Sequence, residues 1–281
     1  MNIDCLIEQG SKILKKQNIT SHQIDAELLL SKAIGKDRVF LLTNGESNVS
    51  TKDTSDYLNF LLRRKRHEPL SYITKKKEFW SLSFEVNHNV LIPRPESEII
   101  VEQVGRRFKG KSNLNVLDIG TGSGCILLSI LKELKKSYGI GIDISFRALN
   151  IAKKNSQKLN LLHKTKFMHC NIDNFDFGNY DIIVSNPPYI CSHRINCLSE
   201  DIKSFEPRMA LDGGSNGLYT ISKVIVKAKK LLKNSGFLFV EIGNKQSQKV
   251  SNMLIKNSFR LVEKFFDYTE TTRCIMSTKI I

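Results

Sequence analysis

An asparagine, two prolines and a tyrosine stand together at the end of an apolar run, in the stretch Asp181-Ile-Ile-Val-Ser-Asn186-Pro187-Pro188-Tyr189. Proline has no N–H, so the chain leaves a sheet rigidly after this run, and the carbonyls of Asn186 and Pro187 stay free. The Asn186 side-chain oxygen and a free carbonyl make two acceptors for one planar NH2 group, and the Tyr189 ring could lie against a planar substrate. The pattern predicts that Asn186, Pro187 and Tyr189 form a site for a planar substrate that presents an NH2 group.

A glycine-rich turn earlier in the chain predicts a nucleoside-bearing ligand. An apolar segment there runs into Asp118 and then into glycines at 120, 122 and 124, and such a turn lets a ligand approach the backbone closely. Asp143 ends the next apolar segment, where an acid can accept hydrogen bonds from ribose hydroxyls. The Gly-x-Gly-x-Gly spacing, with an acid two residues ahead, suits a cationic ligand better than a pyrophosphate.

Both motifs resemble those of a known enzyme class. The glycine turn resembles the first motif of Rossmann-like S-adenosylmethionine-dependent methyltransferases, and Asn-Pro-Pro-Tyr resembles the catalytic motif of those that act on planar nitrogens. The flanking segments resemble more narrowly the glutamine methyltransferase family of peptide-chain release factors, in the stretches Arg63–Ile73, Glu78–Trp80, Val90–Glu98, Phe205–Arg208 and Glu241–Gly243. This resemblance covers nearly the whole chain and implies methylation of the glutamine in the Gly-Gly-Gln loop of class I release factors, in support of translation termination.

The resemblance also implies roles for single residues. It implies that S-adenosylmethionine contacts Asp118, Gly120, Thr121, Gly122, Asp143, Asn171 and Asn186. It implies that the substrate contacts Arg94, Pro95, Glu96, Asn186, Pro187, Pro188 and Tyr189. Arg94 to Glu96 would form a strand-edge segment that closes the site between the domains. Two positions depart from the family, because Ser97 replaces the usual Thr and Asn171 replaces an acid that meets the adenine amino group.

Composition excludes several other classes of protein. The chain has 281 residues, 41% of them apolar and 25% charged, which is typical of a soluble globular protein. No apolar run reaches the roughly 18–20 residues of a membrane span, and the N-terminal stretch lacks the features of a secretory signal. We therefore expect a cytoplasmic protein whose six scattered cysteines are free thiols. Cys191, His193 and Cys197 lack a fourth ligand at a suitable spacing, so we expect no metal.

Hydrophobic periodicity predicts the elements that position these residues. Helical spacing predicts an all-helical substrate-docking domain over residues 1–77, and a period near two predicts a hairpin linker over 78–95 with its turn at Asn87–Asn89. Strands and helices then alternate, which predicts an α/β, doubly wound methyltransferase domain over 96–281. The resemblance implies a seven-stranded sheet whose last strand is antiparallel. The expected parallel strands are Asn115–Ile119, Tyr138–Asp143, Lys166–Cys170, Asp181–Ser185 and Phe237–Ile242.

Two alternatives remain open from the residues alone. An adenine methyltransferase acting on DNA or RNA would share the Asn-Pro-Pro-Tyr turn and would profit from the net charge of +15, but the intervals between motifs are too short for a target-recognition insertion. A cofactor-binding protein without catalysis would not need Asn186.

The basic cluster Arg63–Lys77 is either a solvated helix end or a docking surface. We expect a monomer with release factors as partners and no stable nucleic-acid or membrane partner.

Overall fold

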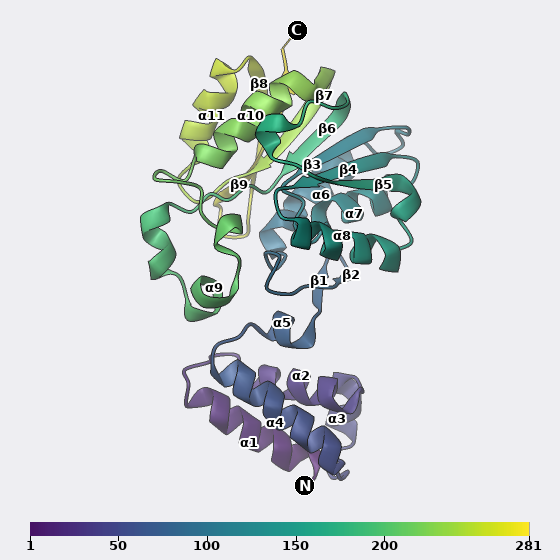
Figure 1. Cartoon of the computed structure of the whole chain (residues 1–281), viewed down its shortest axis with the longest axis vertical. Helices are drawn as coiled ribbons and strands as arrows, with labels where there is room; N and C mark the ends of the chain where they lie inside the picture. The colour runs from purple at the N-terminus through teal and green to yellow at the C-terminus, as the bar shows by residue number, and fades with distance from the viewer. Residues whose placement is uncertain (281) are drawn as a thin grey trace. The chain divides into compact units, whose positions relative to one another are not determined.

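The computed structural model describes residues 1–280 and contains two compact units. The first unit, here called the helical unit, comprises Met1–Lys76 together with Ser199–Phe205. The second, the sheet unit, comprises Lys77–Leu198 and the chain from Glu206 onward. Figure 1 labels the elements of both. No helix within residues 1–280 is long and apolar enough to cross a membrane.

The helical unit confirms the expected all-helical N-terminal region. Its helices are α1 (Ile3–Lys15), α2 (His22–Ile34), α3 (Arg38–Thr43), α4 (Thr51–Lys65), α5 (Leu70–Thr74) and α9 (Glu200–Phe205). The side chains of Asn2, Asp37 and Ser50 cap α1, α3 and α4 by accepting a backbone N–H of the first turn. Apolar side chains at helical spacing form one buried cluster, which includes Leu14 and Leu29.

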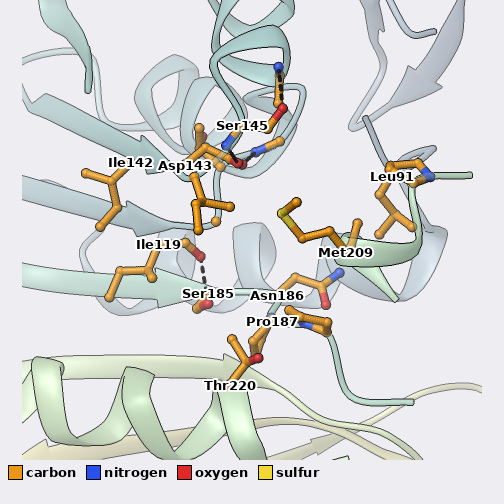
Figure 2. A pocket seen from close by; sticks show the side chains of 18 of the residues that line it. Leu91, Ile119, Ile142, Asp143, Ser145, Ser185, Asn186, Pro187, Met209 and Thr220 are labelled. Atoms are coloured by element: carbon orange, nitrogen blue, oxygen red, sulfur yellow. Dashed lines mark hydrogen bonds between the residues drawn. The ribbon is translucent and has the colours of Figure 1, made fainter. Parts of the chain in front are cut away.

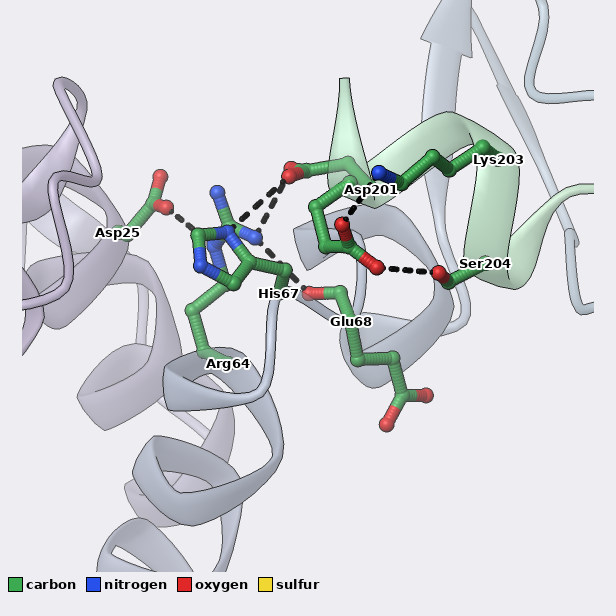
Figure 3. Close-up of polar contacts among 8 residues, drawn as sticks. Asp25, Arg64, His67, Glu68, Asp201, Lys203 and Ser204 are labelled. Carbon is green, nitrogen blue, oxygen red and sulfur yellow. Dashed lines mark hydrogen bonds and ion pairs between the residues drawn. The ribbon is translucent and has the colours of Figure 1, made fainter. Parts of the chain in front are cut away.

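A buried ion-pair network holds α9 in the helical unit (Figure 3). Arg64, whose side chain is 7% exposed, donates from Nε to Asp25 Oδ2 at 2.7 Å and from Nη1 to Asp201 Oδ2 at 3.0 Å. Its Nη1 also donates to the carbonyl of Glu68 at 3.1 Å. A buried charge is tolerated only when it is paired and hydrogen-bonded. The helical unit therefore needs a carboxylate from α9, far along the sequence.

A seven-stranded sheet forms the centre of the sheet unit, with the order β5-β4-β3-β6-β7-β9-β8. All strands run in the same direction except β9, which pairs antiparallel with both β7 and β8. This topology confirms the predicted Rossmann-like sheet with an antiparallel last strand. The strands are β3 (Asn115–Ile119), β4 (Tyr138–Asp143), β5 (Thr165–His169), β6 (Tyr180–Ser185), β7 (Leu232–Glu241), β8 (Phe259–Phe266) and β9 (Thr272–Lys279).

Helices cover both faces of this sheet (Figure 1). They are α6 (Glu98–Arg107), α7 (Cys125–Glu133), α8 (Phe146–Lys158), α10 (Tyr219–Leu231) and α11 (Ser247–Lys256). Successive side chains of a strand point to opposite faces, so Val116 packs with residues of α6 and α7, whereas Leu117 packs with residues of α10 and α11. Because both faces are buried, the central strands are continuous apolar runs, which made them recognisable in the sequence.

The hairpin lies in the sheet unit, and Asn87–Asn89 form the predicted turn, but this turn does not join the hairpin strands. The paired strands are β1 (Lys77–Phe79) and β2 (Leu82–Phe84), joined by Trp80 and Ser81 with φ of 51° and 53°. Positive φ at both residues is typical of the two-residue hairpin turns whose twist matches that of the flanking strands. The Trp80 N–H donates to Glu98 Oε1 at 2.8 Å, which holds the unusual backbone in place. Asn87 instead caps its own turn by accepting the Asn89 N–H.

Candidate active site

A cavity of about 760 Å³ lies at the carboxyl ends of the central parallel strands. Ile119 lines it from the end of β3, Asp143 from the end of β4, and Asn186 from the residue after β6 (Figure 2). Parallel α/β sheets bind ligands at this edge, because the loops that follow the strands converge there. The structure thus brings together the two motifs singled out in the sequence.

The glycine turn and Asp143 form one wall of the cavity. Gly120 and Gly122 have φ of +76° and +55°, and a Cβ added at Gly120 would meet no atom within 4 Å. The backbone here therefore faces open space. Asp143 Oδ2 accepts the Gly122 N–H at 2.9 Å, and Oδ1 accepts the Ser145 N–H at 2.8 Å. Burial raises the pKa of Asp143, although these backbone donors favour its charged form.

Asp118 is buried behind this wall. Its Oδ2 accepts the Thr121 hydroxyl at 2.7 Å, whereas its Oδ1 has no hydrogen-bond partner within residues 1–280. Burial raises the pKa of Asp118 to about 7. Thr121 itself lines the cavity, and Asp118 does not. A buried acceptor without a donor is rare in folded proteins, so an orphaned carboxylate oxygen beside open glycine backbone fits a ligand with a cationic end.

Two hydrogen bonds hold Asn186 in position, one made by the preceding residue and one by its own side chain. The preceding residue, Ser185, donates its hydroxyl to the Ile119 carbonyl at 2.7 Å, which ties the end of β6 to the end of β3. Asn186 donates from Nδ2 to Ser97 Oγ at 3.0 Å. Within the described chain, neither Asn186 Oδ1 nor the Pro187 carbonyl receives a hydrogen bond, so both acceptors predicted from the sequence are available.

A buried carboxylate, that of Glu241 at the end of β7, stands behind Asn186. Its Oε2 accepts the Ser97 hydroxyl at 2.6 Å, and its Oε1 accepts the Tyr189 hydroxyl at 3.3 Å. Burial raises the pKa of Glu241 to about 7. Tyr189 is therefore anchored by its hydroxyl and does not line the cavity, so its predicted contact with a planar substrate stays a prediction.

The segment before α6 differs from the expected strand edge. Arg94 is extended and lines the cavity, but Pro95–Ser97 form a 3-10 helix that leads into α6, so the predicted conformation is wrong. Proline favours the first position of a helix because its φ is already suitable. Pro95 and Glu96 do not line the cavity. Arg94 pairs with buried Glu206 at 2.6 Å, a partner that the sequence motifs did not suggest.

Other predicted residues lie in the cavity wall, together with several that were missed. Asn171 and Pro188 line the cavity, as the resemblance implied. Leu91, Met209 and Thr220 line it as well (Figure 2). Leu91 lies within the Val90–Glu98 stretch that resembles the family, Met209 directly follows the Phe205–Arg208 stretch, and Thr220 lies outside these stretches. These adjoining stretches were the signal that could have drawn attention to Leu91 and Met209, whereas the 62% exposure of Met209 is visible only in the structure.

The sheet order, the glycine turn and the free acceptors after β6 define the chain as a Rossmann-like methyltransferase. A model described as a methyltransferase domain matches residues 110–275, and one described as the PrmC N-terminal domain matches residues 6–74. The chain belongs to the release factor glutamine methyltransferase family. This confirms the resemblance noted in the sequence.

Curated relatives match nearly the whole chain. Proteins named release factor glutamine methyltransferase are 37% identical in Clostridium acetobutylicum, over 98% of this chain and 98% of theirs, and 36% identical in Caulobacter vibrioides, over 95% and 92%. Among solved structures, a putative RNA methyltransferase of Pyrococcus horikoshii superposes with a TM-score of 0.50 at 12% identity, covering 68% of this chain and 85% of that one. The latter likeness concerns the fold alone.

Proposed function

We propose that this chain transfers the methyl group of S-adenosylmethionine to the side-chain amide nitrogen of a glutamine, namely that of the Gly-Gly-Gln motif in class I release factors. The observation that carries the proposal is the pair of unoccupied acceptors, Asn186 Oδ1 and the Pro187 carbonyl, beside an open glycine turn. The names of the relatives support release factors as the substrate.

The proposed chemistry explains why two acceptors are needed. An amide nitrogen is a poor nucleophile, because its lone pair is delocalised into the carbonyl group. S-adenosylmethionine supplies an electrophilic methyl group on a sulfonium. Asn186 Oδ1 and the Pro187 carbonyl would each accept one N–H of the substrate amide, which orients the nitrogen and favours the charge distribution of the transition state. Pro188 keeps the second acceptor rigid.

The cofactor would lie along the glycine turn. Gly120, Thr121 and Gly122 would face the methionine portion, with the orphaned Asp118 carboxylate behind them to balance its positive charge. Asp143 would accept hydrogen bonds from the ribose, since each of its oxygens keeps a free lone pair beyond the one used by a backbone N–H. Asn171 would meet the adenine.

Replacing Asp143 with alanine is expected to weaken S-adenosylmethionine binding by about 1.5–3 kcal/mol, or about 10- to 100-fold in Kd, through loss of charge-assisted hydrogen bonds. Asp181→Ala is the control, because this carboxylate lies at the start of β6 and pairs with Lys233. Titration calorimetry with S-adenosylmethionine measures both. An unchanged Kd in the Asp143 variant would remove this residue from the cofactor site.

The substrate assignment is tested by methyl incorporation with labelled S-adenosylmethionine. We expect one methyl group on an intact release factor, none on a release factor whose Gly-Gly-Gln glutamine is replaced by alanine, and none on duplex DNA. Binding of DNA without methylation would reflect the net charge of +15 and would weaken steeply with salt. Efficient methylation of adenine in DNA would contradict the proposal in favour of a nucleic-acid methyltransferase.

The rest of the substrate surface follows as part of the same proposal. Residues 1–77 would dock the release factor, residues 78–95 would link them to the methyltransferase domain at 96–281, and Arg94, Pro95 and Glu96 would contact the loop around the glutamine. Two cations of the basic cluster are engaged inside the helical unit, since Arg64 is buried and Arg63 pairs with Glu68 at 2.5 Å. Docking would therefore depend on the remaining cations of that cluster.

A further inference from the structure

We propose that Glu241 is a positioning residue, which acts through Ser97 to fix the direction in which the Asn186 side-chain amide faces. The inference rests on the proposed function, because the direction matters for catalysis only if Asn186 Oδ1 binds a substrate N–H. Glu241 is 1% exposed and does not line the cavity. It can therefore influence the reaction only through the residues that contact it.

The direction of an asparagine amide is decided by its hydrogen bonds, because its oxygen and nitrogen ends have nearly the same shape. In one direction, Asn186 presents Oδ1 to the cavity and can accept a substrate N–H. In the other, it presents an NH2 group that would meet the substrate NH2 donor to donor. An active site that uses this oxygen needs a hydrogen-bond partner for Asn186 that favours the first direction.

The single hydroxyl hydrogen of Ser97 decides which end of the Asn186 amide faces it. A hydroxyl has one hydrogen, and Ser97 commits it to Glu241 Oε2 at 2.6 Å. The remaining capacity of Ser97 Oγ is as an acceptor. At 3.0 Å from Asn186 it can receive Nδ2 but cannot donate to Oδ1. An ionised Glu241 thus forces the nitrogen toward Ser97 and the oxygen toward the cavity.

The same carboxylate holds the last residue of the motif. The Tyr189 hydroxyl donates to Glu241 Oε1 at 3.3 Å. Burial raises the pKa of this phenol, so it stays a donor. One buried group therefore contacts both ends of the Asn-Pro-Pro-Tyr turn, directly at Tyr189 and through Ser97 at Asn186. Ser97 and Glu241 are 144 positions apart in the sequence, so no local sequence pattern produces this contact.

Protonation of Glu241 would remove the constraint on the direction of the Asn186 amide. A protonated carboxyl can donate to Ser97 Oγ, which frees the Ser97 hydrogen to face Asn186 Oδ1. Around Glu241, the charge of Glu96 favours protonation and that of Arg273 opposes it. The Cys125 and Cys274 thiols also face it, but burial raises their pKa values and they stay neutral. With a Glu241 pKa of about 7, methyl transfer should decline as the pH falls through neutrality.

The test compares full-length enzyme carrying Glu241→Gln, Ser97→Ala or Ser97→Thr, assayed on release factor at saturating S-adenosylmethionine. We expect Ser97→Ala to lower kcat by about tenfold, the effect of one lost hydrogen bond, and Glu241→Gln to lower it by less, because its amide oxygen can still accept the Ser97 hydroxyl. The cofactor Kd should be unchanged in both. Ser97→Thr keeps the hydroxyl and should keep kcat. Ser277→Ala, which removes a buried hydroxyl that has no partner within residues 1–280, is the matched control and should also keep it.

The pH profile separates positioning from a merely structural role. At saturating S-adenosylmethionine the sulfonium would favour the charged form of Asp118, so the step below a pH of about 7 in the wild type would belong to Glu241. Glu241→Gln should be flat across that range, since its side chain cannot ionise. A profile in Glu241→Gln that keeps the wild-type step would overturn the proposal. Wild-type kcat in both Ser97→Ala and Glu241→Gln would overturn it as well.

A readout without catalysis keeps this inference distinct from the proposed function. In protein labelled with 15N at asparagine, hydrogen exchange of the Asn186 Nδ2 group should be slow at pH 8 in the wild type and in Ser97→Thr. It should be fast in Ser97→Ala and intermediate in Glu241→Gln. If the wild type fails to methylate release factor but shows this pattern, the substrate assignment fails and the positioning role stands. Equal exchange in all variants overturns the positioning role.

Discussion

Replacing Asn186 with alanine is expected to lower kcat for glutamine methylation by about 10²–10³-fold, or about 2.7–4 kcal/mol in the transition state. The variant loses one of the two acceptors that align the substrate nitrogen, and the Pro187 carbonyl cannot hold both N–H groups. The loss should fall on kcat more than on cofactor binding, because the glycine turn and Asp143 keep their contacts with each other. Single-turnover methyl transfer and cofactor titration measure the two quantities.

The controls for Asn186 depend on what its oxygen contributes. Asn252→Ala changes an exposed asparagine of α11 and should leave turnover unaffected. Asn186→Asp keeps an acceptor facing the cavity but places a second oxygen against Ser97, so we expect activity between those of the wild type and the alanine variant. Wild-type turnover in Asn186→Ala would contradict both the catalytic assignment and the proposed function.

The largest effect on stability is expected from Arg64→Met. This change leaves the buried Asp25 carboxylate, 4% exposed, without its cation, and breaking a buried pair in this way costs about 3–5 kcal/mol. The unfolding transition of the helical unit, followed by circular dichroism in urea, should therefore shift to a much lower denaturant concentration. Because the chain contains two units, this transition has to be analysed separately from that of the sheet unit.

Two comparisons test whether charge burial is the cause. Arg63→Met removes the neighbouring arginine, whose side chain is 41% exposed, and an exposed pair of this kind contributes about 0–1 kcal/mol. The double variant Arg64→Met with Asp25→Leu removes both charges and should recover much of the lost stability. If the double variant is as unstable as Arg64→Met, packing and not the uncompensated charge accounts for the effect.

Where the sequence predicted the fold well, the signal was local. The buried strand Asn115–Ile119 has the predicted bounds, because a continuous apolar run ends at a glycine turn. The strand expected to begin at Phe237 begins at Leu232, since α10 passes directly into β7. The hairpin turn was misplaced because Trp80 and Ser81 adopt a backbone that their residue types do not suggest.

The contacts of the site likewise divide into those that local sequence signals predicted and those that they did not. Asp143 and Gly122 could be paired from the sequence, because the order of strands in a doubly wound sheet places consecutive strand ends side by side. The contact of Glu241 with Ser97 joins residues 144 positions apart, and no motif connects them. Hydrogen bonds between distant segments depend on the packing of the whole unit, so they become visible only in three dimensions.

The participation of α9 in the helical unit limits how the protein can be recombined with its relatives. The unit is encoded by two separate stretches, Met1–Lys76 and Ser199–Phe205. A chimera that exchanges only the first stretch would replace Arg64 while keeping Asp201, and a truncation of that stretch would leave this carboxylate without the arginine that pairs with it. A graft of the helical unit should therefore carry both stretches from one parent, although they are separated in the sequence.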